Sequence, residues 1–254
     1  MDIIAALDHA RSASNVLEHP FYLRWNRGEL SAEELQRYAH EYRHAVIAIA
    51  DVSRQAAECA APERRDALHA HALEERAHLA MWDRFLEAVL AAAPAAERAG
   101  ADAGAHAHRL VHAPGSVPAP ERAPAHAPAP ALAPGPEPLA QTRSCTAAWG
   151  AGSDLLERLA ILYCIEAGQP AVSASKIHGL VEHYGYSPDS PALEYFRVHT
   201  HLDVHHARQA RELIGQLICG APQGQDPAER MLARGRDALR ANWLLLDGVE
   251  AAAR

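Results

Sequence analysis

The sequence predicts an all-α fold, a bundle of about seven helices in a single domain, and three observations carry that prediction. Apolar residues in most segments recur at the spacing of one helical face, and no segment alternates well enough to indicate a strand. Alanine, the strongest helix former, is abundant along the chain. Hydrophobic residues make up 49% of the 254 residues, which is enough to bury one core.

Start and stop signals divide the first half of the chain into helices. Pro20 can occupy the first position of a short helix, which ends at the turn Asn26-Arg-Gly28. Ser31 and Glu34 form a capping box that opens a long helix, and Pro62 separates this helix from the next. The helices predicted in this half cover residues 2–17, a short stretch from 20, residues 31–59 and residues 63–93.

The composition changes between about residues 100 and 140. Nine of the 17 prolines lie between Pro114 and Pro138, mixed with alanine. Proline removes a backbone donor and blocks helix formation, whereas alanine offers little surface to bury. We therefore expect a disordered, low-complexity Ala/Pro-rich insertion that interrupts one domain spanning residues 1–254.

Helical signals return near Trp149. Ser153-Asp154 can cap a helix, which Gly168-Gln-Pro170 should kink or break. Ser190-Pro191 then fits the cap and first residue of another helix. The helices predicted in this half run from 153–154 to about 168, from there to about 183, from 190 to about 219, and from a cap at Asp226 onward.

Three residues of metal-ligand type share one face of the helix predicted from 190 to 219. His199, Asp203 and His206 are spaced by four and three residues, which places them within roughly 60° of one another on a helix. His201 and His205 point away from this face. The three residues on the face can present metal ligands from rigid backbone, or they can form a polar cluster in the core.

Three further candidates lie on the apolar stripes of two other predicted helices. A buried, unpaired carboxylate costs several kcal/mol, so Glu166 needs a cation, a proton or an ion-pair partner. Glu75 and His78 form a Glu-x-x-His pair, which is typical of carboxylate-bridged dimetal sites but also occurs on solvated helix faces.

Together these residues offer three carboxylates and three imidazoles from three predicted helices. Such a set suits two non-haem irons or an iron–manganese pair. No cysteine belongs to it, which argues against an iron–sulfur cluster or a zinc ribbon. The six candidate ligands are Glu75, His78, Glu166, His199, Asp203 and His206.

Charge and hydropathy exclude several classes of function and location. The net charge of −8 leaves no basic surface for nucleic acid or an anionic membrane. Apolar runs are far shorter than the ~18 residues that span a membrane, and the N-terminus lacks the features of a signal peptide. The four cysteines are widely spaced, as is typical of free thiols in a reducing compartment. We therefore expect a soluble cytoplasmic protein.

Lys176 is the only lysine among the 24 lysine and arginine residues. Arginine can replace lysine wherever charge alone matters, but arginine cannot serve as a deprotonatable amine. The retained lysine therefore indicates either a chemical role or an ordinary surface position. From the residues alone, Tyr22, Tyr38 and Tyr42 can be explained as packed core aromatics.

At these residues the chain resembles the haem-oxygenase-like dimetal oxidases, relatives of the thiaminase-like and PQQ-synthase-like helical folds. The ligand pattern of that group is Glu…His, then Glu, then His-x-x-x-Asp/Glu-x-x-His. The matching residues here are Glu75…His78, Glu166 and His199-x-x-x-Asp203-x-x-His206. The first gap is short for the group, so Glu74 is a second candidate for that ligand. The resemblance covers nearly the whole chain outside the insertion and implies a haem-oxygenase-like bundle.

Within this group the chain looks most like the p-aminobenzoate synthases of chlamydiae and their bacterial relatives, which consume their own side chains to make a folate precursor. That resemblance implies that Tyr22 supplies the ring, that Lys176 supplies the amine and that Tyr38 assists. It also implies two metal ions (Fe/Fe or Fe/Mn), O2 as the oxidant and an external reductant.

Two alternatives stay open. The metal centre could act catalytically on an external small molecule such as an amino acid or a fatty acid, or the chain could be a metal-free helical binding protein. The expected partners are O2, a reductant and, in the first alternative, a small-molecule substrate, with a homodimer as the candidate assembly. Neither nucleic acid nor a membrane is expected as a partner.

Overall fold

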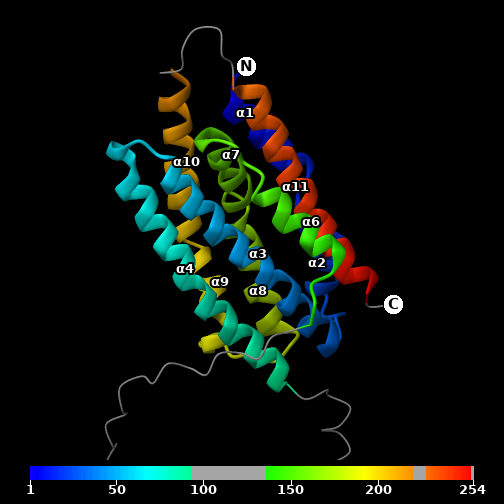
Figure 1. The fold of residues 1–254 in the computed structure, drawn as a ribbon. Coiled ribbons are helices and arrows are strands. Elements are labelled where there is room, and N and C mark those ends of the chain that lie inside the picture. Colours follow the sequence, from blue (N-terminus) through cyan, green and yellow to red (C-terminus); the bar gives the residue numbers. More distant parts are fainter. Residues whose placement is uncertain (93–135, 220–226, 253–254) are drawn as a thin grey trace, which may run out of the picture.

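The computed structural model describes residues 1–92, 136–219 and 227–252, which form a bundle of helices lying side by side (Figure 1). No strand occurs within these ranges, and eight of their helices have ten or more residues, so the prediction of an all-α bundle is confirmed. The helices are α1 (Ile3–Ala13), α2 (Pro20–Trp25), α3 (Ala32–Cys59), α4 (Pro62–Ala91), α6 (Ala140–Trp149), α7 (Leu155–Glu166), α8 (Gln169–Glu182), α9 (Glu194–His199), α10 (Leu202–Cys219) and α11 (Ala228–Ala251), with 3-10 turns η1 (Val16–Glu18) and η3 (Pro191–Leu193).

The two longest helices, α3 and α4, pack along each other and begin at the predicted signals. In the capping box, Glu34 N donates to Ser31 Oγ at 3.2 Å, and Ser31 N donates to Glu34 Oε2 at 2.7 Å. Gly28 has φ +69° in the turn before α3, a conformation that favours glycine. Pro62 is the first residue of α4, where its missing N–H costs nothing.

Helix α6 was not predicted, because its N-terminal cap comes from another helix. Glu41 of α3 accepts hydrogen bonds from Leu139 N and from the Thr142 hydroxyl, which satisfies the start of α6 across 98 residues of sequence. The expected insertion at about 100–140 lies outside the described residues up to 135, and residues 136–139 lead directly into α6.

The helix expected from 190 to 219 is interrupted in the structure, which corrects the prediction of one continuous helix. Helix α9 ends at His199, and α10 begins at Leu202. The Thr200 hydroxyl donates to Arg197 O at 2.7 Å, and His201 N donates to Val198 O at 3.1 Å. Both bonds reach back three residues and tighten the chain into a turn, so the expected single face is divided between two helices.

The break between α7 and α8 is where Gly168-Gln-Pro170 predicted it. Asp154 caps α7 by accepting from Glu157 N at 2.9 Å, and Glu166 is the last residue of that helix. Helix α8 begins at Gln169 and carries Lys176 in its middle. Because of this break, the buried carboxylate of Glu166 lies on α7 and the buried amine of Lys176 lies on α8.

The C-terminal helix α11 joins the two ends of the sequence, because α1, α6 and α7 all pack against it (Figure 1). Helix α10 packs against α7 on the other side. Trp25, Trp82 and Trp149 are fully buried, and each indole N–H donates to a backbone carbonyl. Among the described residues, no helix is long and apolar enough to cross a membrane.

Candidate metal centre

The six predicted ligands come from four helices and face the interior of the bundle. Each side chain is at most 3% exposed, so bulk water does not reach the group. The ligands are distributed as Glu75 and His78 on α4, Glu166 at the end of α7, His199 at the end of α9, and Asp203 and His206 on α10. His201 and His205, which we expected off this face, are exposed.

Two groups of potential metal ligands share one carboxylate. Within each group the ligand atoms lie within 4.8 Å of one another. The first group is His71, Glu75, Glu166 and His206, and the second is Glu75, His78 and His199. Glu75 lies between them, since Oε2 is 3.3 Å from His78 Nδ1 and Oε1 is 3.4 Å from His206 Nδ1. A carboxylate shared in this way can bridge two cations.

Asp203 lies beside the first group without belonging to either group. Its Oδ1 is 3.7 Å from His206 Nδ1. Burial and the nearby carboxylates of Glu166 and Glu75 raise the pKa of Asp203 to about 7, although its contact with His206 opposes this. A cation at this position would favour the ionised carboxylate and remove the repulsion.

His71 was missed by the sequence analysis, although it has a recognisable signal. It precedes Glu75 by four residues on the same face of α4 and is only 5% exposed. His71 Nε2 lies 3.0 Å from Glu166 Oε1 and 3.7 Å from Glu75 Oε1. Burial lowers the pKa of His71, but the charge of Glu166 and the contacts with Glu166 and Glu75 together outweigh it and raise this pKa to about 9.

Several buried polar atoms in the two groups and in the neighbouring Asp203 have no hydrogen-bond partner among the described residues. They are Glu75 Oε1, both carboxylate oxygens of Glu166, Asp203 Oδ2, His71 Nε2 and His206 Nδ1. Unsatisfied buried polar atoms are rare and cost free energy, so such a concentration needs a partner. Carboxylate oxygens and imidazole nitrogens that approach one another without hydrogen-bond alignment are suited to a shared cation. The residues therefore fit non-haem metal ions.

Hydrogen bonds on the outer side of two imidazoles select the nitrogen that faces the centre. His199 Nδ1–H donates to Tyr195 O at 2.6 Å, which leaves Nε2 as the free lone pair. His206 Nε2–H donates to Glu74 Oε2 at 2.9 Å, which leaves Nδ1 facing Glu75. Glu74, the alternative to Glu75 as a predicted ligand, is half exposed and contacts the side of His206 that faces away from the centre. Such outer partners orient metal-binding histidines.

Lys176 lies in a buried cluster of aromatic rings next to this centre. Its side chain is fully buried, and its Nζ has no hydrogen-bond partner among the described residues. The Nζ lies 4.6 Å from the ring centroid of Tyr42, 5.2 Å from that of Tyr38 and 5.6 Å from that of Tyr22. Burial lowers the pKa of Lys176 to about 7, so a neutral, nucleophilic amine is accessible near neutral pH.

The two predicted tyrosines are hydrogen-bonded to each other. Tyr22 Oη lies 3.1 Å from Tyr38 Oη, and burial raises the pKa of both phenols well above the usual value of 10. Tyr42, which is not among the predicted site residues, has the ring nearest Lys176 within the cluster, and its hydroxyl accepts from Gln169 Nε2 at 3.1 Å. The cluster therefore holds three protonated phenols around one amine.

Aromatic rings connect this cluster to the metal-ligand groups. His199 stacks on Tyr195 with ring centroids 3.9 Å apart. Tyr195 lies 4.9 Å from Trp82, and Trp82 lies 5.2 Å from Tyr42. A continuous series of packed rings therefore connects the metal ligand His199 to Tyr42.

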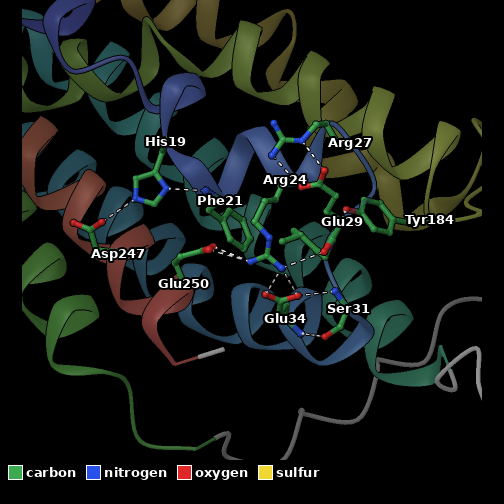
Figure 2. A network of polar contacts seen from close by, with 11 residues as sticks. His19, Phe21, Arg24, Arg27, Glu29, Ser31, Glu34, Tyr184, Asp247 and Glu250 are labelled. Atoms are coloured by element: carbon green, nitrogen blue, oxygen red, sulfur yellow. Dashed lines mark hydrogen bonds and ion pairs between the residues drawn. The ribbon is translucent and has the colours of Figure 1, made fainter. Parts of the chain in front are cut away.

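The short helix α2, which carries Tyr22, is tied to two long helices (Figure 2). His19 caps it by accepting from Phe21 N at 3.0 Å, and the other ring nitrogen donates to Asp247 of α11 at 3.1 Å. Arg24 pairs with Glu34 of α3 at 2.7 Å and with Glu250 of α11 at 3.0 Å. A six-residue helix has little stability of its own, so these contacts fix the position of Tyr22.

Helix α2 also fixes helix α8. Trp25 Nε1 donates to the backbone carbonyl of Lys176 at 3.3 Å. At Gly179 a Cβ atom would lie 2.5 Å from the indole ring of Trp25, so only glycine allows this close approach. Tyr22 and Lys176 are thus held in register by contacts between their two helices.

Comparison with known proteins agrees with this geometry. The sequence profile of a family described as iron-containing redox enzymes matches residues 35–239. Proteins called 4-aminobenzoate synthase are similar along nearly the whole chain. The protein from Chlamydia muridarum is 28% identical, with 97% of this chain and 89% of the relative covered, and that from Nitrosomonas europaea is 26% identical, with 96% and 89% covered.

Solved structures show the same fold at low sequence identity. A TenA homolog from Pseudomonas syringae has a TM-score of 0.69 at 14% identity, covering 98% of this chain and 91% of that one. A domain with a heme oxygenase-like fold from Shewanella denitrificans has a TM-score of 0.67 at 14% identity, covering 100% and 94%. The predicted fold and the predicted class of non-haem dimetal oxidoreductase are confirmed. The chain belongs to the haem-oxygenase-like family of iron-containing redox enzymes.

Proposed function

We propose that this protein is an O2-dependent dimetal oxidase that forms p-aminobenzoate from its own side chains, with Tyr22 as the source of the ring and Lys176 as the source of nitrogen. The observation that carries the proposal is the environment of Lys176. The only lysine of the chain is fully buried, has no hydrogen-bond partner among the described residues, and lies over three tyrosine rings. Such a position costs stability and is hard to explain by packing alone.

The seven buried donors would hold two ions, Fe/Fe or Fe/Mn, with Glu75 shared between them. These are the six predicted ligands together with His71. When bound, the ions activate O2 with electrons from an external reductant. Glu74 and Tyr195 O would hold the rings of His206 and His199 in the orientation that binding requires.

The side chains around Tyr22 would assist the conversion of its side chain to p-aminobenzoate. The Cα–Cβ bond of Tyr22 breaks, Cα takes a hydrogen, and O2 oxidises Cβ to a carboxylate. The Cε–Nζ bond of Lys176 also breaks, with Cε oxidised to an aldehyde by O2, and the released nitrogen replaces the phenol oxygen, which leaves as water. The reductant supplies the remaining electrons. Tyr38 can orient the phenol of Tyr22 through their 3.1 Å hydrogen bond. Burial of all three residues keeps water away, so the oxidised ring meets the amine.

A single isotope label tests the nitrogen source, because the chain has one lysine. The protein is grown with lysine carrying 15N at Nζ, loaded with ferrous iron with or without manganese, and given reductant and O2 without substrate. We expect at most about one 15N-labelled p-aminobenzoate per chain, and peptide mass mapping should find Tyr22 altered. Unlabelled product would exclude Lys176 as the nitrogen source.

Matched variants test the ring source. Tyr22→Phe and Lys176→Arg should form no product. Tyr163→Phe is the control, because Tyr163 bonds to Asp8 and lies outside the cluster. Loss of Tyr42 in place of Tyr22 in the peptide map would reassign the ring. Many turnovers on an added small molecule, with Tyr22 intact, would instead identify a catalytic oxidase.

A further inference from the structure

A cavity of about 430 Å³ reaches Tyr22 and Tyr42 from the surface of the bundle. It lies where α1 and η1 meet the break between α7 and α8 and the middle of α11. The exposed residues Ser12 and Glu18 belong to its wall, so it opens outward. Its volume falls within the range of small-molecule binding sites.

The wall of this cavity combines apolar and polar side chains. The apolar ones include Val16, Leu17, Ile165, Val172 and Leu239, and the polar ones include Ser14, Asn15, Gln169 and, at the exposed rim, Ser12 and Glu18. Asn242 of α11 is 8% exposed, and its Oδ1 has no hydrogen-bond partner among the described residues. Arg11 of α1 contacts Asp8 and Ala167 O through its terminal nitrogens, while its Nε–H also lacks such a partner. The cavity thus offers an unused acceptor and an unused cationic donor beside a group of apolar side chains.

We propose that this cavity binds the aromatic acid that the protein makes, p-aminobenzoate, and is the route by which it leaves. Its flat ring can pack against the apolar side chains of the wall, its amine can donate to Asn242 Oδ1, and its carboxylate can accept from Arg11. The identity of the ligand rests on the proposed function. Tyr22 is only 1% exposed, so a ring released from it needs a path, and loss of that side chain would extend the cavity inward.

The test measures binding to the metal-free full-length protein by isothermal titration and equilibrium dialysis. Three probes are compared: p-aminobenzoate, benzoate without the amine, and aniline without the carboxylate. We expect saturable binding of one p-aminobenzoate per chain and weaker binding of the two fragments. Loss of one hydrogen bond should weaken binding by about tenfold.

Two variants should give opposite patterns. Asn242→Leu should weaken p-aminobenzoate and aniline but leave benzoate unchanged, and Arg11→Gln should weaken p-aminobenzoate and benzoate but leave aniline unchanged. Arg11 is one-third exposed, so its replacement tests the site even if Asn242→Leu does not fold. Leu244→Phe, exposed on α11 and outside the cavity, is the control and should bind like the unchanged chain.

Absence of saturable binding, or binding that neither variant weakens, would overturn the inference. The assay uses no metal, O2 or turnover, so its failure leaves the proposed synthesis standing. Conversely, loss of 15N-labelled product formation with p-aminobenzoate still bound would reject the synthesis and keep the site.

Discussion

Two buried polar regions lie next to each other in this bundle, and their unsatisfied atoms differ in chemical type. The unpaired atoms of the metal-ligand groups are buried carboxylate oxygens and imidazole nitrogens, which are acceptors that a cation can satisfy. The tyrosine–lysine cluster has one unpaired amine among rings, and a cation would only repel its protonated form. A bound cation can therefore satisfy the unpaired atoms of the first region. In the second region the buried amine lowers the stability of the fold, and a functional role is needed to explain it.

The largest expected effect separates stability from function at Lys176. Lys176→Met should form no product and should unfold at a higher denaturant concentration than the unchanged metal-free protein. The pKa of this amine is about 7 in the fold against 10.5 for an ordinary lysine, so the unfolded state binds the extra proton between these values. The gain should be on the order of 4 kcal/mol at pH 7.

This gain should depend on pH in a defined direction. The stability of the unchanged protein should rise between pH 7 and about 10.5, so the advantage of Lys176→Met should shrink over that window. Denaturant unfolding at several pH values measures it. A Lys176→Met protein that is less stable at pH 7 would contradict the idea that the amine is held at a cost.

An intermediate effect is expected in the other region, at His71. His71→Ala removes a member of the four-residue group but leaves Glu75, His78 and His199 in place. We expect the bound metal to fall from near two ions per chain to near one, with the lost ion weakened by more than about 100-fold. Elemental analysis after equilibrium dialysis measures this. Two ions at unchanged affinity would show that His71 is only a packed core residue.

A smaller effect is expected at Glu74, which contacts His206 from outside the centre. Glu74→Ala should keep both ions but weaken binding by about 10- to 100-fold, because His206 loses the partner that orients its ring. Glu87→Ala, exposed on the same helix, is the matched control. Loss of an ion rather than weaker binding would indicate that Glu74 is itself a ligand.

The two regions also differ in the contacts that fix their geometry. Three of the metal-ligand residues, His71, Glu75 and His78, follow one another on consecutive turns of α4, so their mutual spacing needs no contact between helices. Tyr22 and Lys176 instead depend on Arg24, on Trp25 and on the ties of α2 to α3 and α11. Substitutions at a distance, in the contacts that hold α2, should therefore disturb the geometry of the tyrosine–lysine cluster.

Sequence alone was sufficient for most of the helices and for the class of enzyme. Helical periodicity, the capping box at Ser31 and the break at Gly168 depend on neighbouring residues, and local sequence specifies them. The candidate ligands were recognisable because burial of a carboxylate such as Glu166 on an apolar stripe is expensive. The single lysine was visible from composition.

Tertiary structure decided which of these residues meet. Helix α6 depends on a cap from Glu41 of α3, which lies 98 residues before Leu139 in the sequence. Convergence of His71 on Glu166, and of Lys176 on Tyr22 and Tyr42, depends on how helices far apart in sequence pack together. Periodicity fixes directions around one helix axis, but only packing between helices fixes the distances from one helix to another.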